Sequence, residues 1–363
     1  MKEKIAIVVG TRPEIIKMAP IIKELQKQKR NFYIIHSGQH YSYKLDRIFF
    51  KQLKLPKPKY KLEVGSSSPA QQTAQIIAKS EKVFNKSKPS IVLVQGDTNT
   101  VLGVAIAAKK MNIPIGHVEA GLRSYDKQMP EEWNRILTDH CSDYLFAPTI
   151  NSKNILIREG IKKENIFVTG NTIVDSVIDN LRFSKYSNKL KLEEQFVLVS
   201  LHRQENVDNL QRFNEIVKGL KSINKKLDIQ IVYPIHPRSK KMAKKFGISF
   251  NGLTVIEPVD YFTFLQLEKN AKLILTDSGG VQEEACILKI PCVTLRNNTE
   301  RPETIDVRAN IVSGVNSKKI LACAKKMINR KPIWRNPFGK GDSAKKIIQI
   351  IKNKKSVFCY RKF

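Results

Sequence analysis

Short apolar runs alternate with amphipathic stretches of helical length along the whole chain, a pattern typical of parallel sheets with crossover helices. In the first half it predicts strands at Ile5–Val9, Phe32–His36, Ile91–Gln95, Ile115–Val118 and Tyr144–Ala147, and helices at Glu14–Lys27, Ala70–Asn85, Thr98–Met111 and Trp133–Cys141. In the second half it predicts strands at Phe196–Leu201, Gln230–Pro234, Leu253–Glu257, Leu273–Thr276, Cys292–Leu295 and Asn310–Val312, and helices at Asn209–Lys225, Ser239–Phe246, Phe262–Asn270 and Val281–Leu288. We therefore expect an α/β protein with doubly wound parallel sheets.

The rhythm of the pattern changes near Thr169–Lys191, where a helical stretch at Thr172–Arg182 leads into a polar segment rich in Lys, Ser and Asn. A chain of 363 residues is also longer than one hydrophobic core usually supports. We predict an N-terminal domain at 1–170, a C-terminal domain at 171–342 and a final helix within 343–363. The pattern alone allows that helix, at Ser343–Asn353, to belong to either domain.

Targeting and redox signals are weak. No apolar run approaches the roughly 20 residues that cross a bilayer, and the N-terminus shows no signal-peptide pattern. The five cysteines are scattered singly and form no C-x-x-C pair, so neither a disulfide framework nor a zinc site is indicated. We expect a cytoplasmic protein without a membrane span and without a metal site.

The net charge is +31, from 64 Lys and Arg against 33 Asp and Glu. Such a balance raises the possibility of nucleic-acid binding. The lysines, however, occur on nearly every predicted helix and are not gathered into one block with interleaved aromatics. This distribution favours a solvated Lys-rich surface over a nucleic-acid partner, and the positive field would still assist an anionic small-molecule substrate.

Cationic residues follow the first predicted strand. The turn Gly10-Thr11-Arg12-Pro13-Glu14 starts a helix that carries Lys17 one turn later. Arg12 and Lys17 would lie near a helix N-terminus, where anions are favoured, although a capped turn with two solvated cations is the plainer alternative. Neither the G-x-G-x-x-G motif nor a Walker-type loop is present, which weakens a dinucleotide or ATP interpretation.

Three carboxylates are candidate functional residues. Asp97 and Glu119 each follow an apolar strand, and Glu131 begins a helix. Asp97 has an alternative role as an N-cap, and Glu131 as a favourable charge in a first helical turn. A carboxylate at the end of an apolar strand, as at Glu119, costs free energy unless it is paired or functional. Ligands collect at the carboxyl ends of parallel strands, where these side chains can converge.

The second half offers a phosphate site. The strand Leu273–Thr276 runs into Asp277-Ser278-Gly279-Gly280, whose glycines let backbone N–H groups approach phosphate oxygens at a helix N-terminus. Glu284 lies one turn into that helix and is suited to accept hydrogen bonds from ribose hydroxyls. His202 closes another strand beside Arg203 and is a candidate acid or charge stabiliser, although a lone histidine is more often structural.

Taken together, the motifs closely resemble those of the non-hydrolysing UDP-N-acetylglucosamine (UDP-GlcNAc) 2-epimerases. The resemblance spans almost the whole chain and rests on Gly10-Thr11-Arg12-Pro13-Glu14, Gly96-Asp97-Thr98, His117-Val118-Glu119-Ala120-Gly121-Leu122-Arg123, Pro130-Glu131-Glu132, Thr169-Gly170-Asn171-Thr172, His202-Arg203, Asp277–Glu284, Arg301-Pro302-Glu303 and Asn336-Pro337-Phe338-Gly339. It implies a glycosyltransferase-B-like fold with two Rossmann-like domains facing a cleft and the last helix returning to the first domain. It also implies a homodimer.

The resemblance further implies interconversion of UDP-GlcNAc and UDP-N-acetylmannosamine (UDP-ManNAc) without NAD or metal, by anti elimination of UDP to 2-acetamidoglucal and re-addition. Asp97, Glu119 and Glu131 match the family's acid/base positions, and which of them removes the proton in each direction stays open. The resemblance implies diphosphate contacts by Lys17, Arg12, His202, Ser278, Gly279, Gly280 and Arg301. It implies a ribose contact by Glu284 and a uracil pocket formed by Val259 and Phe264.

One departure concerns allosteric activation by UDP-GlcNAc, for which family members carry a second Gln after a Gln-His pair and a nearby Arg. Here Gln39-His40 is present, but Asp46 stands at the position of the second Gln, and Val64–Gln72 contains no Arg. We expect turnover of UDP-ManNAc without added UDP-GlcNAc. A sugar transferase of the same fold remains the main enzymatic alternative, although it has no requirement for three carboxylates around C2. A hydrolysing relative would instead release free ManNAc and UDP.

Overall fold

The computed structural model describes residues 4–39, 49–181 and 192–358. Contacts between Cα atoms divide the chain into an N-terminal unit, Met1–Ser176 with Phe338–Phe363, and a C-terminal unit, Val177–Pro337. The sequence placed the two boundaries at 170 and 342. His40 and Asp46 lie outside the described residues, as do residues 182–191 of the polar segment.

The N-terminal unit is built on a seven-stranded parallel sheet with strand order β3-β2-β1-β4-β5-β6-β7. Its strands are β1 (Ile5–Val9), β2 (Phe32–His36), β3 (Tyr60–Lys61), β4 (Ile91–Gln95), β5 (Ile115–Val118), β6 (Tyr144–Ala147) and β7 (Ile166–Val168). Its helices are α1 (Arg12–Lys27), α3 (Pro69–Ser87), α4 (Asn99–Lys110), α5 (Pro130–Cys141), α6 (Ile150–Arg158), the 3-10 turn η1 (Lys163–Asn165) and α15 (Ser343–Phe358), with α7 (Thr172–Leu181) at the junction of the units.

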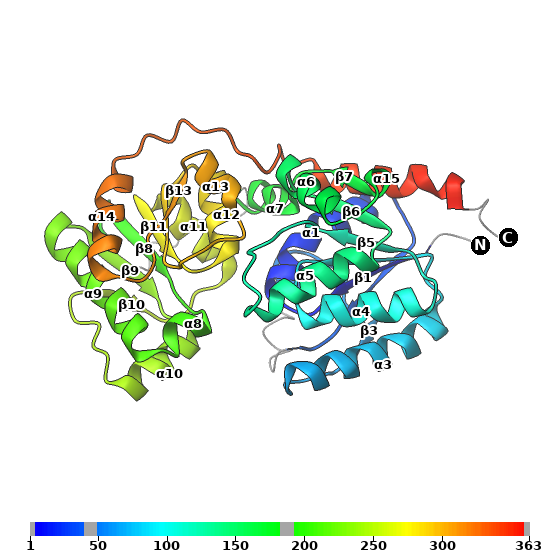
Figure 1. Ribbon diagram of the computed structural model, residues 1–363, viewed down its shortest axis with the longest axis horizontal. Helices are drawn as coiled ribbons and strands as arrows, with labels where there is room; N and C mark the ends of the chain where they lie inside the picture. Colours follow the sequence, from blue (N-terminus) through cyan, green and yellow to red (C-terminus); the bar gives the residue numbers. More distant parts are fainter. Residues whose placement is uncertain (1–3, 40–48, 182–191, 359–363) are drawn as a thin grey trace. The chain divides into compact units, whose positions relative to one another are not determined.

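The C-terminal helix α15 belongs to the N-terminal unit, where it packs against α1 (Figure 1). The Asp175 carboxylate accepts hydrogen bonds from the backbone N–H groups of Ser343 and Ala344, at 3.3 and 3.1 Å. An acceptor at this point satisfies N–H groups that have no partner within the helix. The end of the chain is thereby anchored to the first unit.

The C-terminal unit contains a six-stranded parallel sheet with strand order β10-β9-β8-β11-β12-β13. Its strands are β8 (Phe196–Ser200), β9 (Gln230–Pro234), β10 (Thr254–Ile256), β11 (Leu273–Thr276), β12 (Cys292–Thr294) and β13 (Asn310–Val312). Its helices are α8 (Gln204–Val207), α9 (Leu210–Leu227), α10 (Pro237–Phe246), α11 (Tyr261–Asn270), α12 (Gly279–Leu288), α13 (Pro302–Asp306) and α14 (Ser317–Ile328). Apolar side chains from both faces of this sheet form two buried clusters.

The predicted fold class is confirmed, because both units are doubly wound parallel sheets with helices between consecutive strands. The prediction missed several elements. Strand β3 has two residues, too few to show a period, whereas α14 carries a readable signal. Its side chains Ile320, Ala324 and Met327 are buried at helical spacing, and Asn316 caps the helix.

Strand order identifies where each unit should bind a ligand. In both sheets the chain runs outward from a central strand in one direction and then resumes on that strand's other side, between β1 and β4 and between β8 and β11. Such switch points leave a crevice outside the carboxyl ends of the strands, where ligands bind in open α/β sheets. The motifs at Gly10–Glu14, Gly96–Thr98 and Asp277–Gly280 follow three of these four strands.

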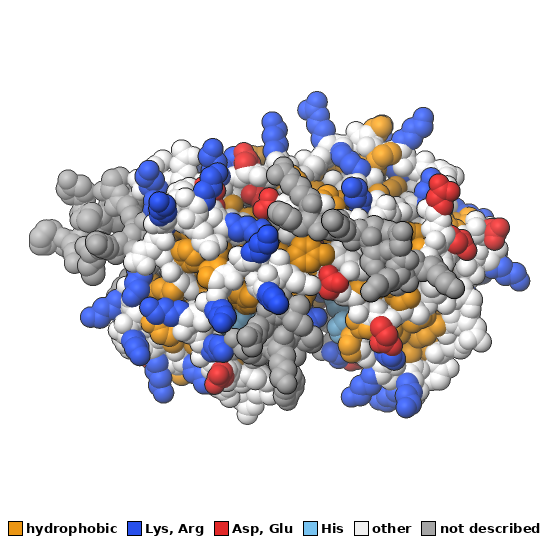
Figure 2. All heavy atoms as spheres, turned by 180° about the vertical axis from the view of Figure 1, so that it is seen from behind, with side chains coloured by type: hydrophobic (Ala, Val, Ile, Leu, Met, Phe, Trp, Pro, Cys, Tyr) orange, Lys and Arg blue, Asp and Glu red, His pale blue; other side chains and the backbone are white. Residues whose placement is uncertain are grey.

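The surface agrees with the dispersed charge expected from the sequence. On the face shown in Figure 2, Lys and Arg side chains are scattered among other types and do not form one continuous patch. Within the described residues no helix has the length and hydropathy needed to span a bilayer. The four described cysteines, Cys141, Cys286, Cys292 and Cys323, are free thiols.

Candidate active site

Glu119 follows β5 directly and is held by three donors. Its Oε1 accepts from Lys17 Nζ at 2.6 Å and from Asn171 Nδ2 at 3.2 Å, and Gln95 donates to Oε2. The residue is buried and has a φ of 73°, a left-handed conformation uncommon for a residue with a Cβ. Such strain at a strand end is characteristic of functional sites. The sequence predicted Glu119 and Lys17, but gave Gln95 and Asn171 no role.

Asp97 lies at the adjacent strand end, after β4, and forms an ion pair with Arg135 of α5. The guanidinium Nε and Nη2 both donate to Asp97 Oδ2, at 2.9 and 2.6 Å, while Nη1 donates to Glu132 Oε2 at 2.6 Å. Asp97 keeps 31% of its side chain exposed, so it is accessible to a ligand. Arg135 was missed at the sequence level, because its partner lies 38 residues away.

The two neighbouring glutamates at the start of α5 differ in role. Glu132 is buried and accepts hydrogen bonds from the backbone N–H groups of Ser124 and Tyr125, so it supports the preceding loop. Glu131 is half-buried, and within the described residues its carboxylate makes no side-chain hydrogen bond. Of this acidic pair, Glu131 is therefore the one available for chemistry.

A buried network fixes the loop that carries Asp97. His117 on β5 places its Nδ1 2.7 Å from Asp139 Oδ1 and its Nε2 2.8 Å from the carbonyl oxygen of Gly96, whose φ is +85°. Arg123 Nη2 lies 2.8 Å from the other oxygen of Asp139. Burial opposes ionisation of Asp139, but the facing His117 and Arg123 outweigh it and lower its pKa. The sequence assigned Asp139 no role, because its partners His117 and Arg123 lie on other elements.

Glu14 joins the two loops of the switch point in the N-terminal unit. The backbone N–H of Gly10 donates to its Oε2 at 2.6 Å, and the Thr98 hydroxyl donates to its Oε1 at 2.7 Å. Burial, assisted by the nearby Asp97, outweighs these hydrogen bonds and raises the pKa of Glu14 from 4.5 to about 7. Arg12 is exposed beside it, with its guanidinium carbon 5.5 Å from the Phe49 ring centroid.

The pKa of Glu14 predicts a pH-dependent stability. A carboxyl whose folded-state pKa exceeds its unfolded value binds its proton more tightly when folded, so it lowers the unfolding free energy as pH rises from about 4.5 to about 7. Glu14→Gln lacks this proton, so its unfolding free energy should rise relative to that of the native protein through that window, by up to about 3 kcal/mol, as measured by denaturant unfolding at a series of pH values. Glu81→Gln, an exposed substitution on α3, is the control. If the difference in unfolding free energy between Glu14→Gln and the native protein did not change with pH, the raised pKa of Glu14 would be contradicted.

In the C-terminal unit, buried Asp277 at the end of β11 organises the loop after β8. Its carboxylate accepts hydrogen bonds from the backbone N–H groups of His202 and Arg203 and from Asn206 Nδ2, at 2.9 to 3.2 Å. Asp277 thus positions the loop that carries His202, whereas Ser278, Gly279 and Gly280 lie at the start of α12. Burial lowers the pKa of His202, opposed by Asp277 and assisted by the positive charges of Arg203 and Arg238.

The start of α12 has the geometry of an anion site. Ser278 is the N-cap, and its Oγ accepts from the backbone N–H of Val281 at 3.5 Å. The N–H groups of Gly279 and Gly280 are first-turn donors that no residue within a helix can satisfy. A Cβ at Gly280 would meet only Ser278 Oγ at 3.8 Å, so the space above this glycine is open.

Arg301 lies beside this helix start. A Cβ on Gly279 would meet the Glu300 carboxylate first and the Arg301 guanidinium carbon at 3.8 Å, and Arg301 Nε donates to buried Glu283 at 2.6 Å. Glu300 is held in turn by Arg296 Nη1 at 2.7 Å and by Arg203 Nη2 at 3.2 Å. The acidic residues thereby orient cationic side chains around the N–H groups of α12.

The predicted ribose and uracil contacts lie on α12, on α11 and in the loop just before α11. Glu284 is buried and accepts a hydrogen bond from the Tyr261 hydroxyl at 3.0 Å. Val259 and Phe264 are partly buried and pack on the edge of the apolar cluster beneath β8 and β11. These three predicted residues therefore lie on neighbouring elements, in a half-apolar setting suited to a nucleoside.

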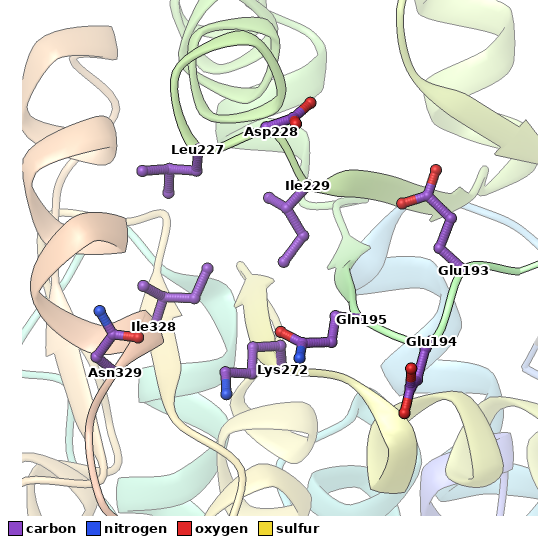
Figure 3. A pocket seen from close by; sticks show the side chains of 9 residues that line it. All are labelled: Glu193, Glu194, Gln195, Leu227, Asp228, Ile229, Lys272, Ile328 and Asn329. Carbon is purple, nitrogen blue, oxygen red and sulfur yellow. The ribbon is translucent and has the colours of Figure 1, made fainter.

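A pocket of about 540 Å³ lies elsewhere in the C-terminal unit (Figure 3). It is lined by Glu193, Glu194, Gln195, Leu227, Asp228, Ile229, Lys272, Ile328 and Asn329. Most of these residues come just before β8, β9 and β11, so the pocket is at the amino ends of the strands. The glycine motif lies at the carboxyl ends, and the pocket therefore contains none of the predicted site residues.

Comparison with known proteins identifies the family. The family model for UDP-N-acetylglucosamine 2-epimerase matches residues 23–352. The UDP-N-acetylglucosamine 2-epimerase of Methanocaldococcus jannaschii is 52% identical over 360 residues, which cover 96% of this chain and 98% of that protein. The chain belongs to the UDP-N-acetylglucosamine 2-epimerase family. The resemblance seen in its motifs is confirmed, and the protein is an isomerase by family.

Two members of the family are named with their ligand or substrate. A crystal structure of the M. jannaschii epimerase in complex with UDP-GlcNAc and UDP aligns with a TM-score of 0.92, covering 96% of this chain and 99% of that one. The UDP-2,3-diacetamido-2,3-dideoxy-D-glucuronate 2-epimerase of Pseudomonas aeruginosa is 38% identical over 330 residues, covering 90% of this epimerase and 93% of that protein. Both names describe reactions at C2 of a UDP-linked sugar.

Proposed function

We propose that this epimerase interconverts UDP-GlcNAc and UDP-ManNAc and supplies UDP-ManNAc for cell-surface glycan synthesis. Removal of the C2 proton and cleavage of the bond between C1 and the diphosphate oxygen form a C1–C2 double bond, giving 2-acetamidoglucal and UDP. Re-addition of UDP at C1, with protonation of C2 on the other face, completes the reaction. Neither the elimination nor the re-addition transfers a hydride, so the proposed route does not use NAD.

The observation that carries this proposal is the set of carboxylates at the carboxyl edge of the first sheet. Asp97 and Glu119 follow neighbouring strands, each facing a cation, and Glu131 lies in the first turn of α5, four residues before Arg135. Paired acids and bases of this kind are what a proton transfer at C2 requires. We assign Asp97, Glu119 and Glu131 to proton transfer, and Lys17, Arg12 and His202 to the departing diphosphate.

The remaining proposed contacts hold UDP. First-turn N–H groups of α12, with Ser278 and Arg301, face the charge that develops on the leaving diphosphate, a form of stabilisation that is often the largest in catalysis. Glu284 accepts from the ribose hydroxyls, and Val259 with Phe264 contacts uracil. We further propose that the protein acts as a homodimer. The four free thiols also agree with a cytoplasmic location.

Proton NMR in heavy water tests the function. Purified protein incubated with UDP-ManNAc alone should produce UDP-GlcNAc carrying deuterium at C2, because the protein base exchanges its proton with solvent. UDP-2,3-diacetamido-2,3-dideoxy-D-glucuronate serves as the competing substrate and should turn over far more slowly. Release of free ManNAc and UDP would instead indicate a hydrolase, and strict dependence on added UDP-GlcNAc would contradict the expected independence from the activator.

A further inference from the structure

Glu268 is a buried acid that the proposed reaction does not use. It lies on α11 with no exposed surface, and neither of its carboxylate oxygens has a hydrogen-bonding donor among the described residues. An ionised carboxylate in this position would lack both water and a compensating cation, which is strongly unfavourable. Its burial therefore calls for a different explanation.

The groups that face Glu268 come from α11, α12 and β12. They are the Glu284 carboxyl, the Tyr261 hydroxyl and the Cys292 thiol, and within the described residues none of them is a cation. Burial and then the charge of Glu284, together with a hydrogen bond to it, raise the pKa of Glu268 well above its ordinary value. A buried carboxyl that has no donor of its own and faces a second carboxyl is most stable when it keeps its proton and shares it with that neighbour.

Tyr261 indicates which of the two carboxyls remains charged. Its hydroxyl donates to Glu284 Oε1 at 3.0 Å, which stabilises the ionised form of Glu284. Glu284 is also nearer to the surface than Glu268, with 6% exposure against none. The proton is therefore best placed on Glu268.

We propose that Glu268 is a positioning residue for nucleotide binding: it stays protonated and donates a hydrogen bond to Glu284, which is thereby held as an ionised acceptor for the ribose hydroxyls. This inference rests on the proposed ribose contact of Glu284. An ionised carboxylate only accepts, so a ribose diol can donate to it, and charge-assisted hydrogen bonds are the stronger kind. The pair would accordingly favour ribonucleotides over 2′-deoxyribonucleotides, which lack one of the donors.

Two substitutions separate the proton donor from simple packing. Glu268→Gln keeps the shape and an N–H donor toward Glu284, whereas Glu268→Met fills a similar volume without any donor. By calorimetry we expect Glu268→Met to weaken UDP binding about tenfold and 2′-deoxy-UDP binding less, with Glu268→Gln restoring most of the loss. Equal losses in both variants, or parallel losses for both nucleotides, would overturn the proposal.

Infrared difference spectroscopy tests the proton without any ligand. The spectrum of the native protein minus that of Glu268→Gln, at neutral pH, should contain the carbonyl stretch of a protonated carboxyl group. Absence of this band would refute the shared proton, even if UDP binds. Failure of the native protein to bind UDP would instead refute the proposed function, and the band would still decide whether Glu268 holds the proton. Because neither native measurement depends on Glu268→Met, a misfolded variant would not obscure the answer.

Discussion

Asp97→Asn is expected to lower the rate of C2 epimerisation by about 10²- to 10⁴-fold, the range that loss of a general acid or base produces. Asparagine keeps the shape of the side chain and an oxygen for Arg135 but cannot carry a proton. Arg135 also keeps its 2.6 Å ion pair with Glu132, so the fold should be preserved. The rate is measured by NMR of UDP-GlcNAc in heavy water, and UDP affinity, measured by calorimetry, should change little.

The matched control is Asp143→Asn. Asp143 immediately precedes β6 and accepts from the backbone N–H of Ile115, so it lies at the amino ends of β5 and β6 in the same sheet, away from the carboxyl ends that carry the proposed site. Its substitution should cost some stability and leave turnover close to native. A native rate in Asp97→Asn, or equal losses in both variants, would remove Asp97 from the catalytic assignment.

The variants of the other two carboxylates, Glu119 and Glu131, should differ in stability. Glu119→Gln should lose as much activity as Asp97→Asn, but it also leaves the buried Lys17 ammonium without its charged partner. Breaking a buried pair in this way typically costs about 3–5 kcal/mol, so its stability must be measured beside its rate. Glu131→Gln breaks no described ion pair and should reduce turnover without a change in melting temperature.

Gly280→Ala is expected to weaken UDP binding by about 10- to 100-fold while leaving the free protein as stable as before or slightly more stable. The added methyl group meets nothing closer than Ser278 Oγ at 3.8 Å, and alanine is favoured over glycine in a helix by about 0.5–1 kcal/mol. The same methyl group would occupy the space in which a phosphate approaches the first-turn N–H groups. Calorimetry with UDP and thermal unfolding measure the two effects separately.

Ser278→Ala provides the contrasting variant. It removes the N-cap acceptor of α12 and should destabilise the free protein by about 1 kcal/mol as well as weaken UDP binding. If both variants bind UDP more weakly while Ser278→Ala alone loses stability, the result would support the start of α12 as the diphosphate site. Unchanged UDP affinity in Gly280→Ala would place the diphosphate elsewhere.

Which predictions could be made from sequence depends on the range of the interactions. Glu119 was recognisable because a carboxylate directly after an apolar strand is anomalous, and the Ser-Gly-Gly turn because only glycine allows close backbone approach. Asp139 and Arg135 carry no such local signal. Each lies on an amphipathic helix, where a charged residue looks solvent-exposed until the fold brings its partner to it.

The sequence by itself determined the α/β class, the order of most strands and helices, the family, and the residues proposed for proton transfer and UDP binding. These follow from local periodicity and from motifs a few residues long. Only the tertiary structure decided that Glu132 supports a loop while Glu131 is available, that Asp277 holds the His202 loop, and that Glu268 lies against Glu284. Such distinctions depend on burial and on partners far apart in the chain, because the free energy of a charged group is set by its surroundings in space.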